Sequence, residues 1–278
     1  MPADDRALRL AVLIDADNIP ARHIEAVLDE LATYGEPSVR RVYGDWSSQA
    51  LGQWKEKARS LGLVMHQQSA NTKGKNASDI GLVIDAMDIL HAGKVDGFVL
   101  VSSDSDFTRL ASRIREDGLQ VIGVGERKTP ESLRNVCNRF IFLENIAATP
   151  EPAADTPTPA KPKEPTKAEK DPPSKAIPLV LAAMKKIGIE EDSYSLGQLG
   201  QVLTQLYPDF DSRTYGSQKL SDLLKRTGRF DVQKGEGNHL MVRDKARSRP
   251  DRGQKIVSSQ SANWSTASRR GPRGSTAA

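Results

Sequence analysis

The sequence predicts an α/β fold in which a parallel sheet is flanked by helices, followed by a small second domain. Apolar runs of strand length alternate with stretches of helical periodicity over the first half of the chain. The runs at 8–14 and 98–101 are apolar almost throughout, which is typical of strands buried on both faces of a parallel sheet. A Pro-rich segment then separates this half from a second periodic region. Strands that alternate with helices imply right-handed crossovers.

The first domain, expected over residues 1–148, has six candidate strands joined by helices. Pro20 and Gly35 bound its first helix, because Pro suits the first turn of a helix and Gly suits its end. A polar loop at 69–76 precedes the helix that begins near Ser78. The expected strands are 8–14, 39–43, 63–66, 98–101, 119–124 and 140–143, and the later helices are 53–61, 78–91, 106–116 and 132–138.

Three further segments follow. Residues 149–173 contain no apolar side chain larger than Ala, so they bury too little apolar surface to offset the loss of chain entropy on folding. This composition predicts a semi-extended linker. Residues 174–243 regain periodicity, and their pattern of three helices and a hairpin outlines a winged helix-turn-helix. Residues 244–278 are rich in Ser, Arg and Gly and should be disordered. The first expected helix ends at Gly188, the second ends at Pro208 and the third spans 213–226. The expected hairpin strands are 230–234 and 239–243.

Charge is distributed unevenly along the chain, whose formal net charge is +4. Residues 1–146 hold 18 basic and 21 acidic side chains, whereas 244–278 hold eight basic and two acidic. A basic tail attracts polyanions by counterion release. The single cysteine, Cys137, excludes an intrachain disulfide and a cysteine-based zinc site. No apolar run approaches the ~20 residues that span a bilayer, and the N-terminal residues lack a signal-peptide pattern, so we expect a cytoplasmic protein.

Aspartates follow the ends of two apolar strands. Asp15 and Asp17 come directly after the first strand, and Asp104 and Asp106 come shortly after the central one. Ligand sites in open α/β sheets lie outside the carboxyl ends of the strands, so these side chains should share a pocket, and Asp79 opens a helix at the same edge. Converging carboxylates repel one another unless a cation binds, and without His or Cys they suit Mg²⁺ better than zinc.

Helix capping is the alternative explanation for acids at strand ends. Capping accounts for Asp106 about as well as metal binding does. Asp15 together with Asp104 requires two coincidences at one edge, which favours a functional role. Asp85 lies six residues after Asp79, or about 240° around a helix, so it should point elsewhere, at a solvated helix edge.

Three separated motifs resemble the NYN domain of the PIN-like nuclease superfamily, in that family's order. They are Leu13-Ile14-Asp15-Ala16-Asp17-Asn18, Lys75 with Asp79 and Asp85, and Val101-Ser102-Ser103-Asp104-Ser105-Asp106-Phe107. The resemblance covers residues 8–146 and implies a Rossmann-like PIN fold with an RNA endonuclease site that depends on Mg²⁺ or Mn²⁺. It assigns metal binding and catalysis to Asp15, Asp79, Asp104 and Asp106, with Asn18 as the supporting polar residue.

The second domain is similar to OST-HTH/LOTUS domains, winged-helix RNA-binding modules that are sometimes joined to NYN domains. RNA is therefore the expected partner, and a homodimer or a protein partner bound through the winged helix is a further possibility. Ser102 and Ser103 can also hydrogen-bond to the carboxylates or to a metal-bound water. The expected RNA contacts are Lys73, Lys75, Ser102, Ser103, Arg213, Tyr215, Lys219, Lys225, Arg226 and Lys234.

Two other functions compete with a ribonuclease. A haloacid-dehalogenase-like phosphatase would use Asp15-Ala16-Asp17 and Ser102, but the later strands do not end in the acidic pair which that chemistry needs. The closer competitor is a catalytically inactive RNA-binding or regulatory protein, because the winged helix and the basic tail alone would support it.

Overall fold

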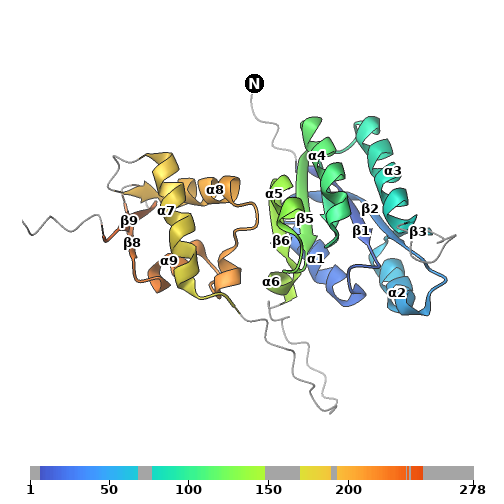
Figure 1. Ribbon diagram of the computed structural model, residues 1–278, viewed down its shortest axis with the longest axis horizontal. Helices are drawn as coiled ribbons and strands as arrows, with labels where there is room; N and C mark the ends of the chain where they lie inside the picture. The colour runs from blue at the N-terminus through green and yellow to red at the C-terminus, as the bar shows by residue number, and fades with distance from the viewer. Residues whose placement is uncertain are drawn as a thin grey trace, which may run out of the picture.

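The computed structural model places a six-stranded parallel sheet between two layers of helices, beside a smaller domain (Figure 1). It describes residues 7–67, 77–147, 170–188, 193–235, 237 and 239–246. The sheet order is β3-β2-β1-β4-β5-β6, and every neighbouring pair is parallel. The strands are β1 (Arg9–Asp15), β2 (Glu36–Gly44), β3 (Val64–Gln67), β4 (Gly97–Val101), β5 (Gln120–Gly125) and β6 (Arg139–Phe142).

Side chains that alternate along β1 supply two separate cores. Leu10, Val12 and Ile14 face one layer, and Ala11 and Leu13 face the other, and all five are fully buried. The first layer contains η1 (Ala21–His23), α1 (Ile24–Leu31), η2 (Gln49–Leu51), α2 (Gly52–Leu61) and α6 (Leu143–Ala147). The second contains α3 (Ala77–Ala92), η3 (Ser105–Phe107), α4 (Thr108–Glu116) and α5 (Glu131–Val136).

The chain reverses its direction of travel across the sheet between β1 and β4. From β1 it proceeds outward through β2 to β3, and it then returns to β4 and proceeds outward through β5 to β6. β1 and β4 are therefore neighbours, with Ile14 opposite Val101. Ligands of doubly wound sheets bind at this kind of switch point, outside the carboxyl ends of the strands. The prediction of a parallel α/β sheet is confirmed.

The second domain packs its helices against a small antiparallel sheet of order β7-β9-β8. Its apolar core includes Val180, Leu199, Leu223 and Phe230. The elements are η4 (Pro173–Lys175), α7 (Ala176–Ile187), β7 (Tyr194–Ser195), α8 (Leu196–Leu206), η5 (Ser212–Tyr215), α9 (Leu220–Arg226), β8 (Phe230–Lys234) and β9 (Leu240–Asp244). None of the helices that the structure describes is both long enough and apolar enough to cross a membrane.

The prediction of one continuous helix over 213–226 is wrong, because the segment is divided into η5 and α9. Asp211 accepts a hydrogen bond from the backbone N–H of Arg213 and caps η5. Gly216 then adopts φ +75°, a left-handed conformation that ends this turn, and α9 begins only at Leu220. β7 was not predicted at all, since two residues carry no periodicity.

The ends of the second domain also differ from the prediction. Residues 170–173, expected in the linker, are part of the described structure, and Asp171 pairs there with Lys175. Asp244, expected in the tail, ends β9 and is buried. The remainder of the expected linker, 149–169, and residues 247–278 lie outside the described residues.

The two domains contact each other along β6, the edge strand (Figure 1). The Phe140 N–H donates to the Pro208 carbonyl at 2.8 Å, which pairs part of this edge. Arg213 donates to both carboxylate oxygens of Glu30, at 2.8 and 2.9 Å, and also to Asp211. Further contacts are Asn145 to Thr214, Arg127 to Asp171 and to the Thr214 carbonyl, and Arg134 to Asp209.

We expect Arg213→Ala to weaken this contact. The substitution leaves the buried Asp211 and the largely buried Glu30 without their shared cation, which should lower the free energy of unfolding by about 1–3 kcal/mol. Urea denaturation of the full chain measures the loss. The matched control is Lys57→Ala, which breaks an exposed pair with Glu25 and should cost less than about 1 kcal/mol. Equal losses in the two variants would contradict the expectation.

Candidate active site

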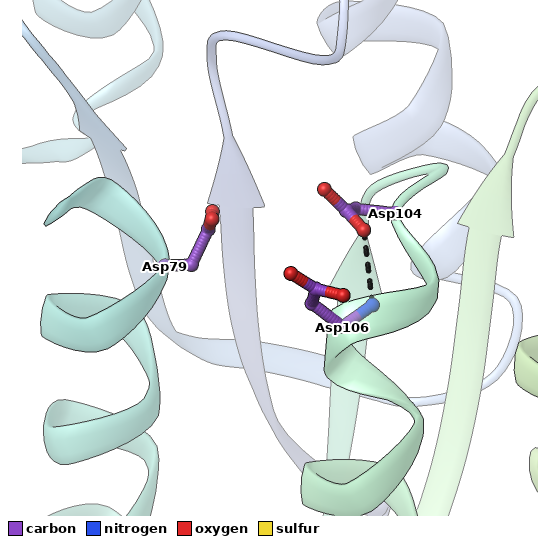
Figure 2. A group of neighbouring side chains, drawn as sticks. All are labelled: Asp79, Asp104 and Asp106. Carbon is purple, nitrogen blue, oxygen red and sulfur yellow. Dashed lines mark hydrogen bonds between the residues drawn. The ribbon is translucent and has the colours of Figure 1, made fainter. Parts of the chain in front are cut away.

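Three carboxylates meet at the carboxyl edge of the sheet (Figure 2). Asp79 comes from the first turn of α3, Asp104 directly follows the loop after β4, and Asp106 lies in η3. Each offers an oxygen within 4.8 Å of the others. Over the described parts of the chain, this is the one group of three or more His, Cys, Asp or Glu side chains so arranged.

A tight turn after β4 brings Asp104 and Asp106 together. The Asp104 carboxylate accepts a hydrogen bond from the Asp106 N–H at 2.9 Å and so caps η3, as Figure 2 shows. The capping role considered for Asp106 therefore falls to Asp104 instead. Asp104 combines both roles that the sequence suggested for strand-end acids, since its second oxygen remains available to the group. Asp106 itself lies inside the turn with its side chain exposed.

Asp15 lies behind this group and is 1% exposed. Its Oδ2 accepts hydrogen bonds from Asn18 Nδ2 at 2.6 Å and from Ser102 Oγ at 2.8 Å. Burial raises the pKa of Asp15 because it disfavours the charged form, while these two hydrogen bonds act in the opposite direction. Asp15 is thus not one of the three clustered carboxylates, but it is held at the junction of β1 and β4 by the predicted partner, Asn18.

The two serines after β4 are buried and turned inward. Ser102 Oγ accepts from the Asp104 N–H at 3.1 Å while donating to Asp15, so it connects the two acids. Ser103 Oγ accepts from the Glu126 N–H at 2.9 Å and ties β4 to the loop after β5. Gly125 permits this approach, since a Cβ there would lie 2.7 Å from the Ser102 carbonyl oxygen. Both hydroxyls are thus engaged in hydrogen bonds within the chain, and their contact with RNA stays a prediction.

Electrostatic repulsion couples the acids. Burial, and after it the charges of Asp15, Asp104 and Asp106, together raise the pKa of Asp79 to about 6. A cation would relieve this repulsion. An oxygen-only donor set of three carboxylates from two elements fits hard divalent ions such as Mg²⁺ and Mn²⁺ and fits zinc poorly.

The sequence missed a polar cluster beneath α3. Asp85 Oδ2 accepts from Arg41 at 2.9 Å and from the Tyr43 hydroxyl at 2.8 Å, and it pairs with His66 Nδ1 at 3.1 Å. Asp85 does point away from the acidic group, but its expected place at a solvated helix edge is wrong. The cluster fixes α3 against β2 and β3, which positions Asp79 six residues earlier on the same helix. Only its place in the resemblance motif singled out Asp85; no local pattern connects it to β2 and β3.

The expected RNA contacts fall into three groups. Lys73 and Lys75 lie outside the described residues. Arg213 and Tyr215 belong to the domain contact, and Arg226 donates to the Tyr215 and Gly216 carbonyls and to Ser217. Lys219, Lys225 and Lys234 are exposed.

Comparison with known proteins agrees with this architecture. Residues 9–144 match the NYN domain family, and residues 170–242 match the OST-HTH/LOTUS domain family. No curated protein matches the chain. A crystal structure of a protein of unknown function from Vibrio parahaemolyticus is 22% identical, covering 49% of this chain and 93% of its own, with a TM-score of 0.42. A solution structure of an uncharacterized protein from Nitrosomonas europaea is 32% identical, covering 34% of this chain and 91% of its own, with a TM-score of 0.24.

The crowded site should make stability depend on pH. With a pKa of about 6 in the folded chain against an ordinary 3.8, Asp79 keeps a proton between pH 4 and 6 that the unfolded chain has lost. Stability therefore falls as the pH rises through this window. In EDTA, Asp79→Asn should melt near the parent below pH 4 and a few degrees above it beyond pH 6.

The control for this comparison is Asp88→Asn, which removes an exposed carboxylate from the same helix. Its melting temperature should follow that of the parent across the whole range. Parallel curves for Asp79→Asn and the parent would show that the acids do not repel one another in the folded chain.

Proposed function

We propose that this chain, which joins an NYN domain of the PIN-like nuclease superfamily to an OST-HTH/LOTUS domain, is a metal-dependent ribonuclease. It hydrolyses phosphodiester bonds of RNA by endonucleolytic cleavage, using Mg²⁺ or Mn²⁺. The observation that carries the proposal is the meeting of Asp79, Asp104 and Asp106 at the switch point of the sheet.

The three clustered carboxylates are the groups that would hold the metal. When bound there, a divalent cation supplies positive charge at the phosphate and lowers the pKa of water. Such ions are held in proteins by one or two carboxylates together with waters and substrate phosphates, so three acids suffice. The exposed position of Asp106 leaves the group open to a ligand as large as RNA.

Asp15 influences the three clustered carboxylates through its negative charge and through its hydrogen bonds. Its carboxylate raises the pKa of Asp79, and its hydrogen bond from Ser102 connects it to the backbone of Asp104. Asn18, three residues after Asp15 and just beyond the end of β1, donates to the same Asp15 oxygen. Because a preorganised group avoids reorganisation during the reaction, this network keeps the negative charge where a cation is needed.

The second domain supplies the affinity for RNA. The nuclease half carries more acidic than basic residues and attracts phosphate poorly at a distance. The exposed Lys219, Lys225 and Lys234 are the proposed contacts of this domain, and Lys73 and Lys75, which lie outside the described residues, stay proposed contacts of the first domain. Because the two domains touch in the structure, RNA held by the second domain would be presented to the first from a fixed direction.

Asp104→Asn tests the catalytic role. Asn can still accept the hydrogen bond from Asp106, so the turn persists while one negative charge is lost. Cleavage of labelled RNA in Mg²⁺ or Mn²⁺ should fall by about a hundred- to a thousandfold, the scale of losing one preorganised electrostatic group. EDTA should abolish cleavage by the parent, and Asp88→Asn, an exposed aspartate outside the group, should cleave as the parent does.

Cleavage that survives both EDTA and Asp104→Asn would overturn the metal-dependent mechanism. Tight RNA binding by the parent without any cleavage in either metal would favour the second candidate, a catalytically inactive RNA-binding protein. The OST-HTH/LOTUS match supports RNA binding in both cases.

Replacing Lys219, Lys225 and Lys234 by Ala should weaken RNA binding mainly at low salt. Each phosphate contact on a single strand contributes about 0.7 to the slope of log K against log salt, so losing three should reduce the slope by about two. Binding titrations at several salt concentrations measure it. The control replaces the exposed Lys185 and Lys186 at the end of α7. An equal change per lysine removed in the control would mean that only overall charge matters.

A further inference from the structure

A cavity of about 520 Å³ lies between the two domains. One wall comes from the loop after β5, from α5 and from Phe142 at the end of β6. The other comes from Asp171 and Leu179 and from residues 207–215 of the second domain. Cavities of 300–1,000 Å³ at domain boundaries, with apolar and aromatic walls and a few polar groups, are typical of small-ligand sites. The three clustered acids do not line it.

Aromatic rings are concentrated in this cavity. Phe142, Tyr207, Phe210 and Tyr215 all line it, although Phe, Tyr and Trp make up only 5% of the chain. The rings of Phe210 and Tyr215 lie 5.9 Å apart at an interplanar angle of 36°, and the Arg134 guanidinium stacks over Phe142 at 5.7 Å. Flat aromatic and guanidinium surfaces of this kind are what nucleobases stack on.

The polar groups favour a base over a lone phosphate. Arg127 and Arg134 line the cavity together with three carboxylates, those of Glu131, Asp171 and Asp209, so the lining carries no excess of positive charge. Both guanidiniums are already paired with acids of the second domain. Arginine donors beside carboxylate acceptors match the edge of a nucleobase, which carries hydrogen-bond donors and acceptors side by side. Among the described residues that line the cavity, both cations are paired, so a phosphate alone would meet carboxylates without an unpaired cation to offset them.

We infer that this cavity binds a nucleobase with its attached ribose, by stacking of the base on the ring of Tyr207. The base could belong to single-stranded RNA or to a free nucleotide. Single-stranded RNA as the source of the base rests on the proposed function. It would add an RNA contact at the loop after β5 to those proposed on the second domain. That loop connects the cavity to the acidic site, because Arg127 pairs with Asp171 beside the cavity and the Glu126 N–H donates to Ser103, the residue before Asp104.

Tyr207→Leu tests the inference in the full chain. Leu keeps an apolar side chain at the end of α8 but removes the stacking surface. The matched control is Tyr34→Leu, a half-buried tyrosine near the domain contact whose ring packs against Arg139 and does not line the cavity. All proteins carry Asp104→Asn and are measured in EDTA, so that cleavage plays no part. The probes are a short single-stranded RNA with one 2-aminopurine and, separately, AMP.

Tyr207→Leu should bind its ligand about five- to a hundredfold more weakly than the parent, the range expected for one lost stacking contact. Quenching of 2-aminopurine fluorescence should be lost with it, while Tyr34→Leu should behave as the parent. Loss confined to the oligonucleotide identifies RNA as the source of the base, and loss of AMP binding identifies a free nucleotide.

Equal affinities for Tyr207→Leu and the parent, with unchanged quenching, would overturn the inference and leave RNA binding by the second domain intact. Binding of neither probe by the parent would overturn it too, and would also count against RNA as the substrate of the proposed nuclease. A cooperative thermal melt of Tyr207→Leu like that of Tyr34→Leu shows that the loss comes from the missing ring and not from misfolding.

Discussion

The candidate site depends on one buried carboxylate. Asp15 is almost entirely removed from solvent, and a charge in that position is tolerated only with hydrogen-bonding partners. Asn18 and Ser102 provide these hydrogen bonds. Ser102 also accepts a hydrogen bond from the backbone N–H of Asp104, which directly precedes η3. The ends of β1 and β4 are thereby joined by side chains as well as by the sheet. The turn that presents Asp104 and Asp106 starts from this junction.

The remaining acids are crowded because α3 and η3 begin close to each other. α3 begins with Asp79 in its first turn, where a helix favours negative charge, and η3 begins after a loop of three residues that follows β4. The cluster of Asp85 with Arg41, Tyr43 and His66 holds α3 down against the sheet. Repulsion among the acids is thus sustained by packing elsewhere, and carboxylates with perturbed pKa values gather at functional sites.

The domain contact contains several ion pairs, and each domain contributes cations that pair with acids of the other. The second domain contributes Arg213 to Glu30, while the first contributes Arg127 and Arg134 to Asp171 and Asp209. Reciprocal pairs of this kind specify one register, since a shifted arrangement would oppose like charges. Through Glu126 and Ser103 the same loop that meets the second domain also reaches the end of β4. The placement of the two domains and the shape of the acidic site are therefore structurally connected.

The sequence by itself determined the alternation of strands and helices, the two buried central strands and the acids at their ends. It could do so because apolar periodicity and turn residues are local, and because neighbouring parallel strands bring their carboxyl ends to one edge. The motif order also indicated the NYN domain, and the pattern of three helices and a hairpin indicated the OST-HTH/LOTUS domain. What only the tertiary structure decided involves partners distant in the chain. These are the partners of Asp85 on β2 and β3, the engagement of Arg213 by Glu30, and the inward turn of Ser102 and Ser103. A charge pattern along the chain cannot distinguish an exposed cation from one buried in a contact, because that depends on which surface the fold places opposite it.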